Sequence, residues 1–210
     1  TKGYLHSYPA LPSHLIKKDD SPNFLIVNSR DLRNSLIKKL NWRKNEIILK
    51  PSSRFQKKSI ITIEPGKIYF PISIKSVEMT LKSLDKLFLV NNNVNFRDLK
   101  VMNHPHGTMF KKNILLEEKT NFLIIRNKNK NKKNFYTKKN TFSIFIEGTG
   151  AIIEALERNI DVYHITENPI FDCYTTNFWN NIECVRIDQN IFKYSLFKKN
   201  HTLLLGNTLK

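Results

Sequence analysis

Residues 141–165 are the part of the sequence that most restricts the possible folds. Residues 141–146 are a short apolar run typical of a buried strand, residues 151–158 place apolar side chains at helical spacing, and residues 161–165 are a second strand-like run. Only Glu147-Gly148-Thr149-Gly150 joins the first strand to the helix. So tight a sequence of strand, helix and strand predicts a βαβ unit, whose two strands pair in parallel.

The same alternation of strands and helices extends upstream. Further strands are predicted at residues 24–27, 46–50, 67–74, 98–103 and 121–126, and helices are predicted after Ser29 and after Ser76. Residues 127–140 are crowded with Lys and Asn and lack aliphatic side chains, so they predict a solvated loop. The whole pattern predicts an α/β fold, a Rossmann-like parallel sheet flanked by helices on both faces.

The charge of the chain bears on its partners. A formal net charge of +17 ordinarily indicates nucleic acid or an anionic membrane surface. Lysine far outnumbers arginine, however, and asparagine and isoleucine are abundant, which is the residue usage of an AT-rich genome. A basic nucleic-acid-binding module built on residues 126–139 is the alternative of another class, but only Phe135 and Tyr136 interrupt that run. We expect no nucleic-acid partner and retain peripheral association with an anionic membrane.

The cysteines and the apolar runs indicate a compartment. Cys173 and Cys184 lack the spacing of zinc ligands, so we expect free thiols in a reducing cytosol and no bound metal. The longest apolar runs are far shorter than the roughly 20 residues that span a bilayer. We therefore expect a cytoplasmic protein, and its start at Thr1 in apparent mid-strand suggests part of a longer chain.

Ligands of open α/β sheets bind beyond the carboxyl ends of the strands, where loops enter helices. At such a place, Gly148 and Gly150 let the backbone approach a phosphate, and Thr149 adds a hydroxyl. The alternative is a tight turn in which Thr149 caps the helix. Glu154, one turn into that helix, can reach a ribose or sugar hydroxyl, or it can support Arg158 at i+4.

Two other strand ends carry polar residues. His104-Pro105-His106-Gly107 places two imidazoles that can donate to phosphate, although the same residues can form a purely structural turn. Ser53 and Arg54 follow another strand and suit an anionic or sugar ligand, or they form an ordinary polar loop. The sequence has neither a Ser/His/Asp triad nor a GxxxxGK[ST] loop, which disfavours hydrolases and P-loop proteins.

These motifs, taken in order, resemble a known family. Residues 146–156 followed by residues 160–163 look like the donor-binding βαβ unit of GT-B glycosyltransferases. Asn103-His104-Pro105 is similar to the His-Pro motif of bacterial sialyl- and Kdo-type transferases, and residues 40–55 resemble a stretch of surface-carbohydrate transferases. The resemblance implies the C-terminal half of a GT-B fold and covers roughly residues 1 to 190.

The resemblance also implies roles for single residues. His104 and Pro105 would contact the donor phosphate, Gly148, Thr149 and Gly150 would bind phosphate at the helix start, and Glu154 would hold the nucleotide sugar. Ser53 and Arg54 would add to the donor site. His6 is the candidate for a catalytic residue, on the remnant of the acceptor domain.

By the same resemblance, residues 1–20 would be the end of an N-terminal acceptor domain and its linker, residues 21–190 the nucleotide-sugar-binding domain, and residues 191–210 a tail. The function implied is transfer of a sugar from a nucleotide sugar to a glycan or lipid-linked acceptor of surface polysaccharide or lipopolysaccharide. No cofactor or metal would be required. A sugar-nucleotide epimerase or a polyol-phosphate transferase on the same fold is the alternative enzyme.

Overall fold

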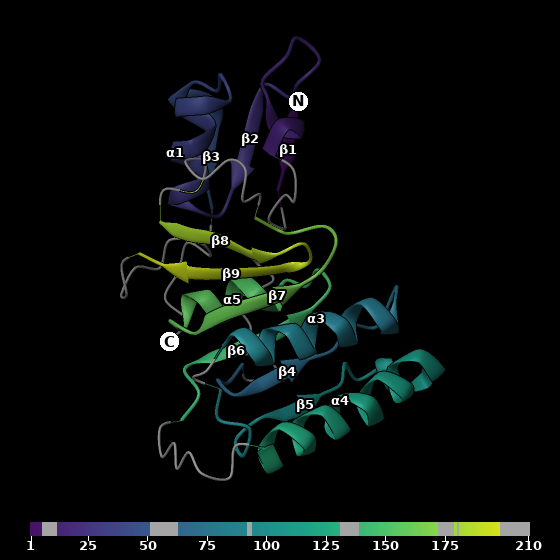
Figure 1. The fold of residues 1–210 in the computed structure, drawn as a ribbon. Helices are drawn as coiled ribbons and strands as arrows, with labels where there is room; N and C mark the ends of the chain where they lie inside the picture. Colours follow the sequence, from purple (N-terminus) through teal and green to yellow (C-terminus); the bar gives the residue numbers. More distant parts are fainter. Residues whose placement is uncertain are drawn as a thin grey trace.

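The computed structural model describes residues 1–5, 12–50, 63–91, 94–130, 139–171, 179 and 181–197, and they form a mixed α/β protein with two sheets (Figure 1). The smaller sheet has three parallel strands in the order β1-β2-β3. These strands are β1 (Lys2–Tyr4), β2 (Phe24–Val27) and β3 (Ile47–Leu49). Helix α1 (Arg30–Lys39) connects β2 to β3, and the short 3-10 helices η1 (Pro12–Leu15) and η2 (Lys44–Glu46) complete this unit.

The larger sheet has six strands in the order β5-β4-β6-β7-β9-β8. The first four strands in that order are parallel, whereas β9 pairs with β7 and β8 in antiparallel fashion. The strands are β4 (Lys67–Tyr69), β5 (Lys100–Met102), β6 (Phe142–Ile146), β7 (Asp161–Ile165), β8 (Ile182–Asp188) and β9 (Ile191–Leu196).

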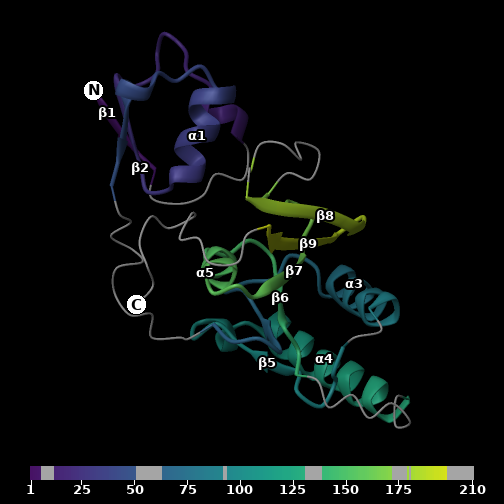
Figure 2. The same ribbon diagram turned by 90° about the vertical axis from the view of Figure 1, so that its left-hand side faces the viewer.

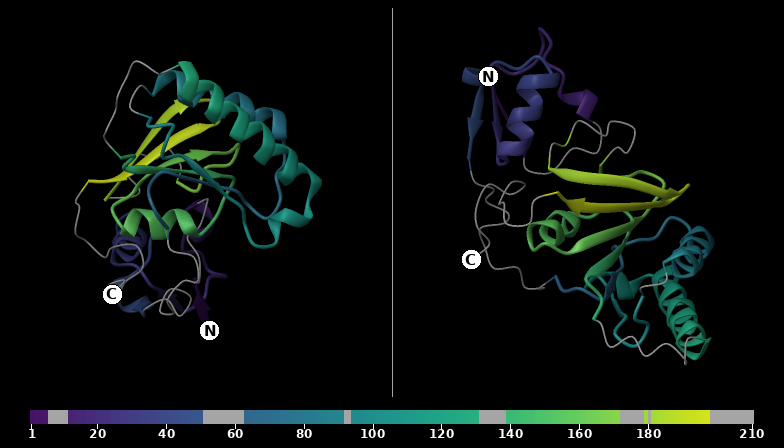
Figure 3. Two further views of the ribbon diagram at one scale, coloured as in Figure 1. Left: turned by 90° about the horizontal axis from the view of Figure 1, so that it is seen from below. Right: turned by 60° about the vertical axis from the view of Figure 1, so that its left-hand side comes forward.

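Helices cover both faces of the six-stranded sheet, as Figures 2 and 3 show. One face packs against α3 (Val77–Val90) and α4 (Lys111–Lys130), which lie side by side. The other face packs against α5 (Ala151–Glu157) and against the three-stranded unit. Residues on successive positions of β6 divide between the two cores, with Ile144 on the α3 side and Phe145 on the α5 side. This alternation is the period of two that a strand imposes.

The two sheets share one hydrophobic core. Leu32 and Leu36 of α1 belong to the same buried cluster as Ile152 of α5 and Phe192 of β9. At the surface of this cluster, the Asn181 side-chain amide donates a 2.8 Å hydrogen bond to Asp31, a carboxylate that is 1% exposed at the start of α1.

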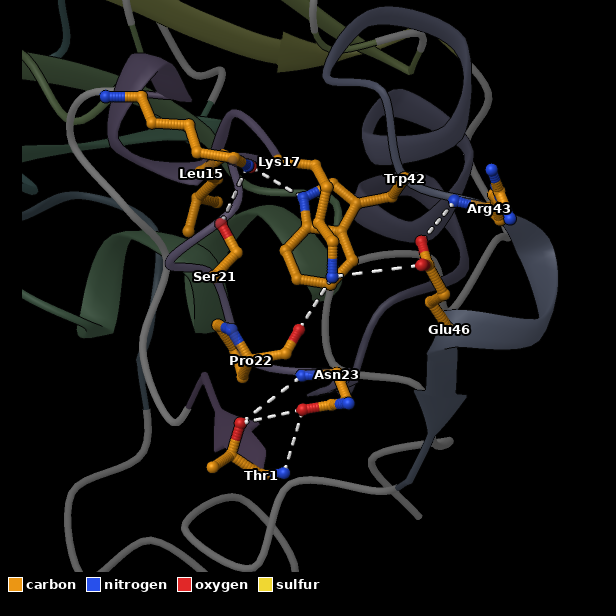
Figure 4. A network of polar contacts seen from close by, with 10 residues as sticks. Thr1, Leu15, Lys17, Ser21, Pro22, Asn23, Trp42, Arg43 and Glu46 are labelled. Atoms are coloured by element: carbon orange, nitrogen blue, oxygen red, sulfur yellow. Dashed lines mark hydrogen bonds and ion pairs between the residues drawn. The ribbon is translucent and has the colours of Figure 1, made fainter.

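A polar network holds the three-stranded unit together (Figure 4). The Trp42 indole donates a 2.6 Å hydrogen bond to the Leu15 carbonyl. The Lys17 ammonium lies 4.4 Å from the centre of the Trp42 ring, donates to the Pro22 carbonyl at 2.8 Å and lies 3.8 Å from a Glu46 carboxylate oxygen. We refer to Lys17, Trp42 and Glu46 as the Lys17 network, which connects segments on either side of β2.

Most predicted elements are confirmed, including the βαβ unit and the strand at residues 24–27. The strand predicted at residues 46–50 covers 47–49, and the strand predicted at 67–74 ends at Tyr69. The strand predicted at residues 121–126 is wrong, because these residues lie within α4. The buried face of α4 alternates polar and apolar residues, which concealed its helical period. The predicted loop at residues 127–140 is also wrong at its start, since α4 continues to Lys130, and residues 131–138 lie outside the described residues.

Two predicted domain boundaries fall within the observed sheets. The sequence placed residues 191–210 in a tail, whereas residues 191–196 form β9 in the large sheet. The boundary expected between residues 20 and 21 falls inside the three-stranded sheet, where β1 pairs with β2. In the described ranges, no helix has the length and apolar character to cross a membrane. The Cys184 thiol donates to the Phe171 carbonyl at 3.5 Å. Cys173 lies outside the described residues.

Candidate functional site

The carboxyl ends of β5, β4, β6 and β7 meet at one edge of the large sheet, because these strands are parallel and adjacent. The chain passes from β4 outward to β5 and then returns to the other side of β4 as β6. The strand order therefore reverses between β4 and β6. Such a reversal opens the crevice in which α/β sheets bind ligands. The predicted turns at residues 104–107 and 147–150 both lie on this edge, after β5 and β6 respectively.

The turn after β5 orients the His104 imidazole. The His106 backbone N–H donates to Nδ1 of His104 at 3.2 Å, and the Gly107 N–H donates to the His104 carbonyl at 2.7 Å. Because Nδ1 accepts a hydrogen bond, the neutral ring carries its proton on Nε2. His104 therefore presents an N–H donor, whereas Pro105 and His106 are exposed beside it. The two imidazole rings lie 5.7 Å apart between centroids.

Asn113 fixes the turns after β4 and β5 to each other. Its side-chain amide donates to the carbonyls of Pro71 and Ile72, at 2.9 Å and 3.1 Å. Gly107 makes this contact possible, because a Cβ at Gly107 would lie 2.7 Å from the Asn113 amide nitrogen and 3.1 Å from the Pro71 oxygen. The sequence argument did not single out Asn113, since an asparagine near the start of a helix carries no specific signal.

Glu147, directly after β6, has two unusual properties. Its backbone is left-handed, with φ of 57°, in a turn where the sequence places glycines at the next position and at Gly150. Such a conformation costs a residue with a side chain about 1–2 kcal/mol. The Glu147 side chain is also only 7% exposed. Oε2 accepts a hydrogen bond from the Thr166 hydroxyl at 3.2 Å, while Oε1 is buried and has no partner among the described residues.

His164 holds the Glu147 backbone in this conformation. Its Nε2 lies 2.9 Å from the Glu147 carbonyl oxygen, which can only accept, so Nε2 donates. Nδ1 must then accept from the Tyr194 hydroxyl, 3.0 Å away. His164 is fully buried, and burial lowers its pKa to about 4, so the ring is neutral near pH 7. We refer to Glu147, His164, Thr166 and Tyr194 as the Glu147 network.

The glycine turn itself differs from its prediction in one respect. The left-handed residue is Glu147, and a Cβ at Gly148 would meet only Ile170, at 4.0 Å. The Gly148 backbone is therefore open to an approaching ligand without being required by packing. The Thr149 hydroxyl accepts from the Ala151 N–H at 3.3 Å, but Thr149 precedes the N-cap residue and is not itself the cap that the alternative expected. Gly150 occupies the N-cap position and makes no side-chain bond.

Glu154 lies in the core instead of facing a ligand. It is 6% exposed and pairs with the Arg158 guanidinium at 2.9 Å, which is the i+4 contact that the sequence offered as the alternative. The pKa of the nearby Tyr69 phenol is raised mainly by burial, with further contributions from the charges of Glu64 and Glu154. Glu154 thus lies on the buried face of α5.

Three predicted residues, His6, Ser53 and Arg54, lie outside the described residues. In the ranges that the structure describes, no three His, Cys, Asp or Glu side chains gather where they could hold a metal ion.

No protein family, curated protein or solved structure was found to match this chain.

The carboxyl edge therefore carries two kinds of groups, on turns that follow strands on either side of β4. His104 and Thr149 offer an N–H and a hydroxyl donor, which suit phosphate oxygens. Glu147 offers a buried carboxylate, which suits a hydroxyl or an N–H. Sequence reasoning found the first kind from turn signals and missed the second, for which the only local signal was a charged residue at the end of an entirely buried strand.

Proposed function

We propose that this chain binds a nucleotide sugar at the carboxyl edge of its large sheet, as the donor-binding part of a GT-B type glycosyltransferase of surface polysaccharide or lipopolysaccharide. The observation that carries the proposal is Glu147, a buried carboxylate with a strained backbone beside the point where the strand order reverses. Backbone strain and unpaired buried polar atoms persist chiefly where function requires them. The resemblance of residues 146–156 to donor-binding βαβ units supplies the class of ligand.

Each group has a chemical role in this proposal. His104 and Thr149 donate hydrogen bonds to the phosphate oxygens of the nucleotide and stabilise the negative charge that develops as the sugar departs. Glu147 accepts from a hydroxyl of the ribose or the sugar. No metal ion is needed for this arrangement. The reaction takes place in the cytoplasm, with a glycan or a lipid-linked sugar as acceptor.

Calorimetric titration of the chain with CMP, CDP, UDP and GDP tests the proposal. We expect one nucleotide to bind with a micromolar Kd. His104→Ala and Thr149→Ala should each weaken that binding about tenfold or more, because each removes a hydrogen bond to a charged group. His14→Ala and Thr141→Ala are matched controls, since both side chains are exposed and neither lies on the carboxyl edge.

A folded chain that binds none of the four nucleotides would contradict the proposal. Binding that the two site substitutions leave unchanged would contradict the position of the site. An electrophoretic shift of RNA or DNA that disappears steeply with added salt would instead favour the nucleic-acid-binding alternative.

A further inference from the structure

Helix α4 has an unusual distribution of polar and apolar residues. Its buried face, which packs on the large sheet and on α3, contains three polar residues among five. These five are Asn113, Leu116, Thr120, Ile124 and Asn127. An ordinary surface helix buries an apolar stripe and exposes polar residues. The buried face of α4 is therefore less apolar than a core-facing helix normally requires.

The opposite face of α4 carries the apolar residues. Ile114, Leu115, Phe122 and Ile125 are 47%, 42%, 66% and 55% exposed. At 3.6 residues per turn, these four side chains form one stripe that points away from the sheet. Figures 1 and 3 show α4 at the outer edge of the molecule, with no described element on that side. Met109 and Phe110, just before the helix, extend the exposed apolar surface.

Basic residues flank this stripe on both sides. Lys112 and Lys119 lie along one border of the stripe and Lys128 lies along the other, and all three are exposed. None of the three forms an ion pair with a carboxylate within the described ranges. Two charged side chains, Lys111 and Glu118, are exposed within the stripe itself, where helical spacing places them between Ile114 and Leu115 around the helix.

We propose that the outward face of α4 binds the surface of a membrane rich in anionic phospholipids. An apolar stripe flanked by exposed lysines is the arrangement with which interfacial helices bind membranes. The apolar side chains enter the boundary between headgroups and acyl chains, and the lysines extend their stems outward to the lipid phosphates.

On the outward face of α4, charge favours an anionic membrane over a second copy of the chain and over nucleic acid. A second copy of the chain would bring the flanking lysines of both copies together, on molecules that each carry a net charge of +17. Nucleic acid would leave the apolar stripe between its phosphates without a partner, because its phosphate contacts select basic side chains. An anionic bilayer offers an apolar boundary to the stripe and phosphates to the lysines.

Vesicle co-sedimentation of the whole chain tests the proposal. The probes are vesicles of phosphatidylcholine alone and vesicles of an equimolar mixture with phosphatidylglycerol. We expect binding to the mixed vesicles only. Phe122→Ser/Ile125→Ser should lower the partition coefficient at least about tenfold by removing buried apolar area. Lys112→Gln/Lys119→Gln should lower it by about tenfold or more, and added salt should mask this second effect.

Two matched double variants control for general effects of composition. Phe24→Ser/Val185→Ser removes exposed apolar side chains from β2 and β8, and Lys18→Gln/Lys38→Gln removes exposed lysines from the three-stranded unit. Both controls should bind mixed vesicles like the unmodified chain, and all four variants should retain its circular dichroism spectrum.

The proposal is overturned if the folded chain ignores mixed vesicles, if it binds both kinds of vesicle equally, or if the α4 variants bind as well as their controls. A chain that ignores vesicles but self-associates until Phe122 and Ile125 are replaced would identify a second copy as the occupant, and this result also overturns the proposal.

Discussion

The two polar networks of this protein differ in burial and in what they hold. The Lys17 network reaches the surface, where the side chains of Lys17 and Glu46 are 21% and 22% exposed, although its Trp42 ring is buried. The Glu147 network lies inside the molecule, where His164 and Tyr194 are fully buried, and it holds a left-handed backbone. Water can replace the first set of hydrogen bonds but not the second. The comparison teaches that position, more than the number of contacts, decides which network determines the geometry of a site.

Replacement of His164 should have the largest effect. His164→Ala removes the hydrogen bonds to the Glu147 carbonyl and the Tyr194 hydroxyl and opens a cavity, so we expect a loss of about 3–5 kcal/mol in the free energy of unfolding. Urea unfolding measures this loss. His104→Ala, in a partly exposed turn, is the control and should change stability by less than about 1 kcal/mol. Equal losses in the two variants would remove the distinction between buried and exposed histidines.

The same histidine predicts a dependence of stability on pH. Its pKa is lowered from 6.5 to about 4 in the folded protein, so the unfolded chain binds a proton at a pH where the folded chain does not. The free energy of unfolding should therefore fall as the pH falls from 6.5 to about 4, by about 3 kcal/mol, and this contribution should be complete above pH 6.5. Comparison with His164→Gln across this range isolates the effect from that of the carboxylates. Parallel curves for both proteins would show that His164 is not buried in its neutral form.

A smaller effect concerns the strain at Glu147. Glu147→Gly relieves the left-handed backbone, whereas Glu147→Ala removes the same carboxylate and keeps the strain. The glycine variant should therefore be more stable than the alanine variant by about 1 kcal/mol in thermal or urea unfolding. Glu154 in α5 is the matched control, because there glycine should be less stable than alanine by about 1 kcal/mol. The same order at both positions would refute a left-handed Glu147.

The smallest effect is expected in the Lys17 network. Glu46→Gln keeps an oxygen that accepts from the Arg43 N–H and removes only the charge near Lys17. We expect a loss of about 0.5 kcal/mol or less in the free energy of unfolding, decreasing further with added salt. A loss comparable to that of His164→Ala would mean that the surface network contributes as much as the buried one.

The parts of the fold that the sequence predicted are those with local signals. The βαβ unit was found because apolar runs and a glycine turn mark β6, α5 and β7 within a short stretch. The start of α4 and its true period were missed because Asn113, Thr120 and Asn127 occupy its buried face. Strand β9 was missed because its partners β7 and β8 supply the reason for its conformation.

In the candidate site, too, the sequence predicted the residues that have local signals and missed the one that depends on distant segments. The turns at His104 and at Thr149 were placed on one edge of the sheet from the order of strands and loops. The importance of Glu147 could not be read from its neighbours, because its conformation depends on His164 and, through that ring, on Tyr194 of another strand. Contacts between distant segments become visible only when the strand order is known.

The contact between His164 and Tyr194 has a consequence for the timing of folding. β9 is the last strand of the described chain, and it pairs with β7 in the middle of the sheet. A nascent chain can form β4, β5, β6 and β7 while β9 is still inside the ribosome. Until β9 arrives, Nδ1 of His164 has no hydroxyl to accept from, and the turn at Glu147 lacks the support that holds it left-handed. The parallel strands can therefore assemble early, whereas the turn at Glu147 acquires its full hydrogen-bonded support only after β9 has left the ribosome.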